Sequence, residues 1–241
     1  MARRRLEKRN EKMNTAKIIA VTQPRIYETE TSHWFYSRQK NLTPEEFIAY
    51  TARVSNPSNQ MNNQTSSKLL NYCAKNKHWS IFEMINIVME INTTRDIARQ
   101  ILRHRSFSFQ EFSQRYADPT VDLGSEIREA RLQDKKNRQN SIETQDDDLK
   151  GTWHYMQMDV NRHAHDAYKW AVQNGIAKEQ ARAVLPEGLT VSKMYMNGTL
   201  RSWIHYCLIR MEEGTQKEHR EVATSAWHEV IKEFPSLKEL I

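Results

Sequence analysis

Between Phe82 and Ile91 the chain alternates between apolar and polar positions. Ile85, Ile87, Met89 and Ile91 fall on one side of an extended backbone, and polar residues fall on the other. A period of two is typical of a β-strand with one face in the core and the other toward water. The pattern therefore predicts a strand over residues 82–91.

The segment before this strand has the start signals and spacing of helices. Thr43 and Glu46 have the spacing of a capping box, and Pro44 suits the first helical turn, so we expect a helix that ends near Ser55. Residues 66–76 then show apolar positions at helical spacing, which predicts a second short helix.

After the strand, Thr93 or Thr94 is expected to cap another helix. Its apolar stripe spans residues 97–102, and the helix leads directly into three cationic residues at 103–105. Residues 106–116 have no helical period but carry two phenylalanines at strand spacing. An extended segment or loop is expected there.

The C-terminal half is rich in helical spacing. Helices are predicted over residues 153–173, 178–184, 191–211 and 216–234. Residues 118–150 are charged and weakly apolar, so we interpret them as a charged insertion or loop. The chain has a strand with one solvent-exposed face, many helices and no βαβ alternation. It is therefore expected to be α+β, with an antiparallel-type sheet covered by helices.

Composition favours a single domain with a core of its own. The chain has 241 residues, of which 38% are hydrophobic, and only 6 glycines and 6 prolines. Its two cysteines, Cys73 and Cys207, lie among helix-core residues without metal or redox spacing, so packing roles are predicted. No apolar run approaches the roughly 20 residues that cross a bilayer, and no signal sequence is recognised, so we expect a cytoplasmic protein without membrane contact.

The positive charge is concentrated at the start of the chain. The net charge is +6, and residues 1–17 contain seven cations and two anions, a net of +5, which leaves +1 for the rest. We therefore divide the chain into a basic arm over 1–17 and one domain over 18–241. A nearly neutral body argues against a domain-wide contact with nucleic-acid phosphates.

The strongest candidates for binding an anionic ligand are Arg103, His104 and Arg105. Consecutive residues point in different directions, and the forked donors of arginine suit phosphate, so this cluster could hold separate anionic groups. Two alternatives remain from the residues alone: a basic helix end that complements the helix dipole, and a nucleic-acid-binding module that uses the basic arm and this segment. No histidine pair has metal-ligand spacing, so no metal site is expected.

The longer string RHRSFSFQEFSQRY resembles the signature of the flavin-dependent thymidylate synthases. In both, Arg-His-Arg is followed by seven residues and then a serine, here Ser113, and the pair Arg115-Tyr116 also agrees. Similar elements occur in family order: TARVS at 51–55, HWSIFE at 78–83, ARAVLP around Arg182, and NGTLRSWIHYCLIR at 197–210. Several spaced elements in order are more specific than one motif.

The resemblance implies two sets of binding residues, with FAD as cofactor and dUMP as substrate. The FAD set is Ser55 from a neighbouring subunit, His78, Ser80, Glu83, Arg103, His104, Arg105, Ser106, Asn197, Arg201 and His205. The dUMP set is Gln100, Arg103, Glu111, Phe112, Ser113, Gln114, Arg115, Arg182 and Arg210. It also implies a homotetramer with active sites between subunits.

By the same resemblance, dUMP is reductively methylated to dTMP. Methylenetetrahydrofolate supplies the carbon, NADPH is the reductant, and FAD carries the hydride. Within the catalytic group, Arg210 or Arg182 would stabilise charge on the uracil. Ser113 is expected to bind the phosphate with Arg115 and not to act as a nucleophile, because no adjacent base activates it.

The stretch after Arg210 departs from the family pattern. It reads MEEGTQKEHREVA, so a flavin contact from Gln216 or His219 is undecided. A flavin reductase acting on another pyrimidine or electron acceptor is a further alternative. It differs in predicting NADPH oxidation that is indifferent to dUMP.

Overall fold

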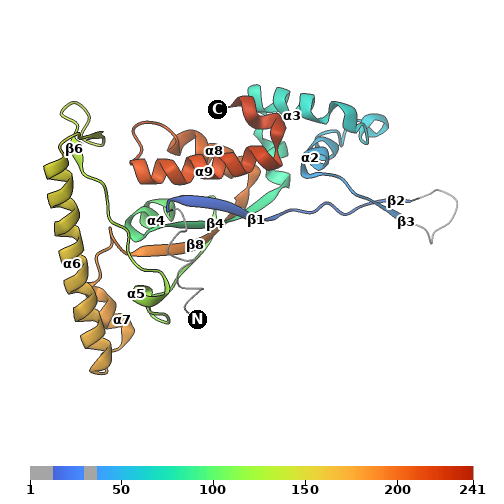
Figure 1. The fold of residues 1–241 in the computed structure, drawn as a ribbon. Helices are drawn as coiled ribbons and strands as arrows, with labels where there is room; N and C mark the ends of the chain where they lie inside the picture. Colours follow the sequence, from blue (N-terminus) through green and yellow to red (C-terminus); the bar gives the residue numbers. More distant parts are fainter. Residues whose placement is uncertain (1–12, 30–36, 241) are drawn as a thin grey trace.

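The computed structural model describes residues 13–29 and 37–240. At its centre is a four-stranded antiparallel sheet in the order β1-β4-β8-β5 (Figure 1). The strands are β1 Thr15–Val21, β4 Asn86–Thr94, β8 Val191–Thr199 and β5 Ser108–Glu111. The first twelve residues of the predicted basic arm lie outside the described residues, whereas residues 15–17 already form part of β1.

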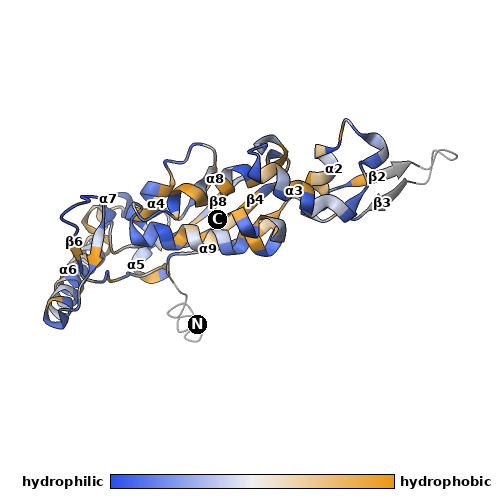
Figure 2. Cartoon of the chain, turned by 90° about the horizontal axis from the view of Figure 1, so that it is seen from above, coloured by the Kyte–Doolittle hydropathy of each residue, from blue (hydrophilic) through white to orange (hydrophobic). Residues whose placement is uncertain are grey.

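Helices cover one face of this sheet and extend to both ends of the molecule. The helices α8 Leu200–Arg210 and α9 Lys217–Glu233 lie along the sheet, and α4 Arg95–Ile101 follows β4 directly. The pair α2 Pro44–Ala52 and α3 Ser66–Lys75 lies toward one end, and α6 Asp147–Gln173 stands at the other (Figures 1 and 2). The predicted α+β class with an antiparallel sheet is confirmed.

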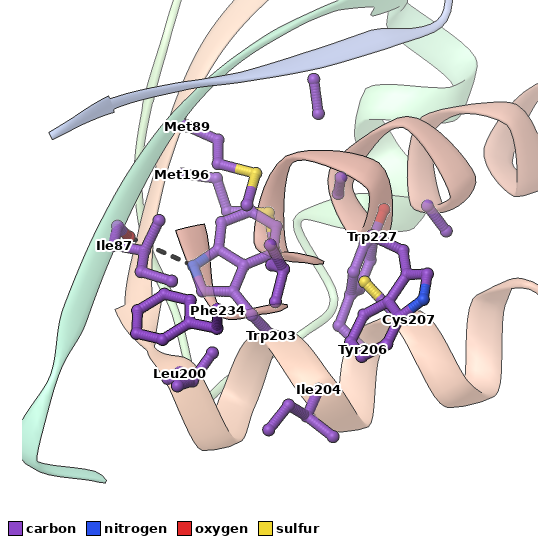
Figure 3. Close-up of a cluster of buried hydrophobic side chains, with 14 of the residues drawn as sticks. Ile87, Met89, Met196, Leu200, Trp203, Ile204, Tyr206, Cys207, Trp227 and Phe234 are labelled. Carbon is purple, nitrogen blue, oxygen red and sulfur yellow. Dashed lines mark hydrogen bonds between the residues drawn. The ribbon is translucent and has the colours of Figure 1, made fainter. Parts of the chain in front are cut away.

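The core forms between the sheet and helices α8 and α9. Ile87, Met89 and Ile91 are fully buried, as the alternating pattern predicts, and Met89 and Met196 are directly opposite in the β4–β8 register. Figure 3 shows Trp203 inserted among these side chains, with its indole N–H donating to the carbonyl oxygen of Ile87 at 3.1 Å. A buried indole needs such an acceptor, so this bond fixes α8 against β4.

Two predicted elements are corrected. Residues 82–84 belong to the 3-10 helix η3 Trp79–Met84, so the strand begins at Asn86. The helix predicted over 191–211 is wrong in its first half, because residues 191–199 form β8. This strand lies between β4 and β5, which satisfy its backbone groups on both sides, and the helix starts only after Thr199 caps it.

Other helix boundaries follow local capping. The Thr43 capping box is confirmed, but α2 ends at Ala52 and not near Ser55. Helix α6 begins six residues before the predicted Trp153, because the Asp146 side chain accepts a hydrogen bond from the backbone N–H of Leu149 at 2.9 Å.

Residues 118–150 are folded more fully than a loop. They contain α5 Pro119–Asp122 and a hairpin of β6 Arg131–Gln133 with β7 Ser141–Glu143. Only 14% of the Arg128 side chain and 12% of the Arg131 side chain are exposed. Some of the charged side chains of this segment are therefore buried in the fold and do not lie in solvent.

Both cysteines have the predicted packing role. Cys73 and Cys207 are buried and unpaired, and burial raises the pKa of the Cys207 thiol. Across residues 13–29 and 37–240, no helix combines the length and apolar character that a membrane span requires.

Candidate active site

Arg103, His104 and Arg105 lie in the turn that follows α4. Phe107, just after the turn, packs its ring against Trp203, with 4.9 Å between ring centroids. This contact holds the turn on the core, so that His104 faces inward while the side chains of Arg103 and Arg105 are exposed. His104 therefore points in a different direction from its two arginine neighbours, in agreement with their consecutive positions.

His104 joins this turn to the last turn of α8. The Nε of Arg210 donates to Nε2 of His104 at 2.9 Å. A guanidinium nitrogen is always a donor, so His104 Nε2 must be unprotonated and the ring proton lies on Nδ1. Burial, followed by the charges of Arg210 and Arg103, lowers the pKa of His104 to about 4, which keeps the ring neutral.

Gln100, near the end of α4, faces the start of α9. Its Nε2 donates to Oε1 of Gln216 at 2.8 Å, and its Oε1 lies 3.2 Å from Nδ1 of His219. The stretch that departs from the family pattern is thus bonded to a residue predicted to bind dUMP.

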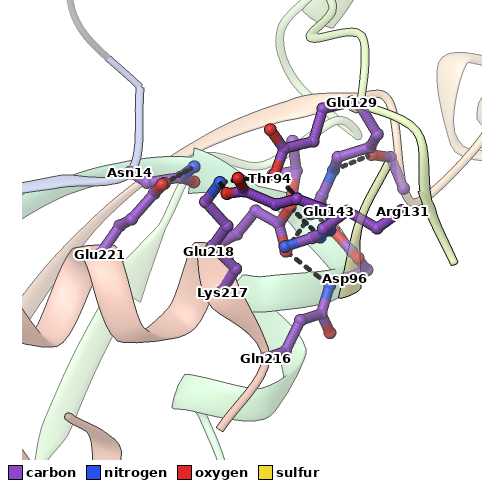
Figure 4. A network of polar contacts seen from close by, with 12 residues as sticks. Asn14, Thr94, Asp96, Glu129, Arg131, Glu143, Gln216, Lys217, Glu218 and Glu221 are labelled. Carbon is purple, nitrogen blue, oxygen red and sulfur yellow. Dashed lines mark hydrogen bonds and ion pairs between the residues drawn. The ribbon is translucent and has the colours of Figure 1, made fainter. Parts of the chain in front are cut away.

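A cluster of buried ion pairs lies next to this contact, at the start of α9 (Figure 4). Arg128 Nη1 lies 2.9 Å from Glu218, Arg131 pairs with the other oxygen of the same carboxylate, and Arg128 also pairs with Asp96 at 2.7 Å. Burial tends to raise the pKa of Glu218, but Arg128, hydrogen bonds and Arg131 together lower it. The sequence interpretation missed these residues, since the paired charges are 87 and 90 positions apart and share no local motif.

Glu111 is held in a second group of polar residues. Its Oε1 accepts a hydrogen bond from Ser192 Oγ at 2.7 Å and lies 3.6 Å from the guanidinium of Arg95. Glu187 then bridges Arg95 at 3.5 Å and Arg99 at 3.3 Å. Arg95 and Ser192 were not identified from sequence, because they approach Glu111 only when α4, β5 and β8 are assembled.

The segment after β5 brings two predicted arginines together at α7 Lys178–Ala181. Arg115 pairs with the Glu179 carboxylate at 3.3 Å, and Arg182 donates to the Glu179 carbonyl at 3.2 Å. Gln114 is buried, and Ser113 Oγ accepts from the backbone N–H of Arg115 at 3.4 Å. Within the described ranges no histidine is hydrogen-bonded to Ser113.

A fourth group contains residues predicted to hold the flavin. Arg201 pairs with Glu83, and the ring of His205 meets Trp79 edge-on at 4.9 Å. Burial and the charge of Arg201 lower the pKa of His205. The remaining predicted residues are exposed or half-buried: Ser55, His78, Ser80, Ser106, Phe112 and Asn197.

The structure brings the predicted residues into four groups, around His104, Glu111, Glu179 and Arg201, but not into one enclosed pocket of the described residues. Among residues 13–29 and 37–240, no hydrogen bond or ion pair connects Arg115 or Arg182 to Arg210. A cavity of about 380 Å³ beside α6 is lined by Arg128, Trp153 and others, and of the candidate site residues only Gln216, whose flavin contact the sequence left undecided, lies in its wall. In one chain, most of the predicted site residues are exposed or half-buried.

Comparison with known proteins gives a consistent result. The family described as "Thymidylate synthase complementing protein" matches residues 39–236. A probable flavin-dependent thymidylate synthase of Paramecium bursaria Chlorella virus 1 is 46% identical over 227 residues, which cover 94% of this chain and 98% of that protein. A flavin-dependent thymidylate synthase of Synechocystis sp. is 51% identical over 196 residues, covering 81% and 88%.

The fold also has a solved counterpart. The crystal structure of a UMP/dUMP methylase, PolB from Streptomyces cacaoi, bound with 5-Br UMP, superposes with a TM-score of 0.71. The match covers 94% of each chain at 20% sequence identity, so it shows a shared fold.

Proposed function

This chain belongs to the flavin-dependent thymidylate synthase family, and on that premise we propose how its residues serve the family's reaction. The enzyme methylates dUMP to dTMP with methylenetetrahydrofolate, FAD and NADPH. The observation that carries the assignment of roles is the hydrogen bond between His104 and Arg210. It joins two motifs that are 106 residues apart in the sequence.

The donor set suits a pyrophosphate-bearing cofactor. The guanidinium groups of Arg103 and Arg105 are exposed and have no hydrogen bond or ion pair within residues 13–29 and 37–240. Free cationic donors of this kind bind phosphate oxygens. Arg103, His104, Arg105 and Ser106 would hold FAD with His78, Ser80, Glu83, Asn197, Arg201 and His205, and the bound flavin would supply the hydride that completes the methyl group.

The dUMP residues divide by chemistry. Ser113 and Arg115 suit the phosphate, with Gln100, Glu111, Phe112, Gln114 and Arg182 around the nucleotide. The Nε of Arg210 donates its hydrogen bond to His104. The two terminal nitrogens of that guanidinium are therefore left to donate to the uracil carbonyls. Donors placed there stabilise the charge that develops on the ring during attack.

The exposed face of α6 supports a homotetramer with active sites between subunits. Trp153, Tyr155, Met156, Val160 and Trp170 are 42–70% exposed on this one helix. Large apolar side chains gathered on one element mark an association surface. Assembly would also bring Ser55 of one subunit to the flavin of its neighbour, and the enzyme would act in the cytoplasm, where nucleotides are made.

The assay measures dTMP formed from dUMP, methylenetetrahydrofolate and NADPH with added FAD. Arg210→Lys is expected to lower kcat about 100-fold, the usual effect of removing a donor to developing charge. Arg220→Lys, on α9 and outside the predicted site, serves as the matched control. A wild-type enzyme that forms no dTMP, or that oxidises NADPH at a rate indifferent to dUMP, would refute the proposal.

A further inference from the structure

We propose that His219 is a positioning residue for dUMP binding, because it fixes the side-chain amide of Gln100 through a directional chain of hydrogen bonds. The inference rests on the proposed function, since Gln100 is one of the residues assigned to dUMP. It concerns Tyr206 of α8, Gln216 just before α9 and His219 of α9, a stretch for which the sequence left only a flavin contact undecided.

The direction of the chain follows from Glu218. An ionised carboxylate can only accept hydrogen bonds, and Arg128 and Arg131 keep this one ionised. The group 2.9 Å from Glu218 Oε2 must therefore be the Nε2 of Gln216. That orientation turns Gln216 Oε1 toward Gln100, so Gln100 must present its Nε2 there, at 2.8 Å.

The other end of the chain is fixed by His219. With Gln100 Nε2 toward Gln216, Gln100 Oε1 faces His219 Nδ1 at 3.2 Å, and this nitrogen must carry the ring proton. Its Nε2 is then an acceptor for the hydroxyl of Tyr206 at 3.1 Å. Every donor in this series of hydrogen bonds meets an acceptor, and reversing the Gln100 amide would place its oxygen against the side-chain oxygen of Gln216.

Burial enforces this arrangement. His219 is fully buried and Tyr206 is 1% exposed, so water cannot replace a lost partner. Burial, with Arg210 and His104, lowers the pKa of His219 to about 3, and burial raises that of Tyr206. The imidazole therefore stays neutral with one N–H, and the phenol stays a donor.

The same side chains also support Arg210. The ring of Tyr206 meets His104 edge-on, with 5.0 Å between centroids, and His104 accepts the hydrogen bond from Arg210. Gln100 is only half-buried, and its second N–H and second lone pair are available to a ligand. The buried hydrogen bonds thus orient the side-chain amide of Gln100, the group proposed to contact dUMP.

The test is calorimetric titration of FAD-loaded enzyme with dUMP. His219→Leu keeps the volume but removes both hydrogen bonds, and Kd for dUMP is expected to rise about fivefold, the net worth of one hydrogen bond. His219→Gln, which retains a donor and an acceptor, should bind within about twofold of wild type. Gln216→Leu breaks the chain on the other side of Gln100, at a half-buried site, and should weaken binding similarly even where His219→Leu fails to fold.

Val230→Ala is the matched control. Like His219, Val230 is fully buried on α9, but it takes no part in the series of hydrogen bonds. It should lower the unfolding temperature without changing Kd. A folded His219→Leu or Gln216→Leu enzyme with wild-type Kd would overturn the inference, and so would an equal rise in Kd for Val230→Ala. A wild-type enzyme that does not bind dUMP would instead overturn the proposed function.

Discussion

Mild acid should destabilise this protein through His219 and His104. Both imidazoles are neutral in the folded chain, with pKa values of about 3 and about 4 against an ordinary value of 6.5. Below pH 6.5 the unfolded chain therefore binds protons that the folded chain does not. Since stability rises with pH wherever the unfolded state binds more protons, the free energy of unfolding must fall as pH drops from 6.5 toward 4.

The size of the effect follows from these pKa values. At pH 5 the protonated form of an unfolded histidine with pKa 6.5 outnumbers the neutral form by about 30 to 1. This favours the unfolded state by RT ln 30, or about 2 kcal/mol for each histidine that stays neutral in the folded state. A folded-state pKa anywhere below about 4 gives nearly the same result, so the figure for fully buried His219 is insensitive to its exact pKa. His104 is half-buried, and solvent screening reduces its share to about 1 kcal/mol.

The assay is urea unfolding at pH 7.5 and pH 5.0, at fixed protein and FAD concentrations. His219 and His104 together should cost wild type about 3 kcal/mol between the two pH values, and His219→Leu should lose about 2 kcal/mol less than wild type. The difference between the two proteins cancels titrations elsewhere in the chain. Equal pH dependence in both would refute the assignment of a buried neutral imidazole at position 219.

Three further outcomes are expected. Ser113→Ala should keep measurable dTMP formation and raise Kd for dUMP about fivefold, and complete loss of turnover at saturating dUMP would contradict a binding role. Gly198→Ala should destabilise the chain by about 1–3 kcal/mol in urea unfolding, because a Cβ there would overlap the Phe107 ring; unchanged stability would count against that packing. Glu218→Leu should lower the unfolding free energy by about 3–5 kcal/mol, because it removes the buried carboxylate that Arg128 and Arg131 share and leaves them, among the described residues, only their ion pairs with Asp96 and Glu129; a small effect would disprove this.

Local sequence determined those features whose physics lies within a few residues. The Thr43 capping box, the buried face of β4 and the turn at Arg103–Arg105 all follow from short-range hydrogen bonding or from the period of the backbone. The spaced arginine and serine signature also identified the family. Each of these signals is complete within one segment.

Tertiary structure decided the rest. Residues 191–199 carry no decisive local pattern and became a strand because β4 and β5 flank them. His104 meets Arg210, and Arg128 meets Glu218, across 106 and 90 positions, so only the assembled fold pairs those groups. Buried polar groups must find partners wherever the fold places them, and no spacing along the chain records that choice.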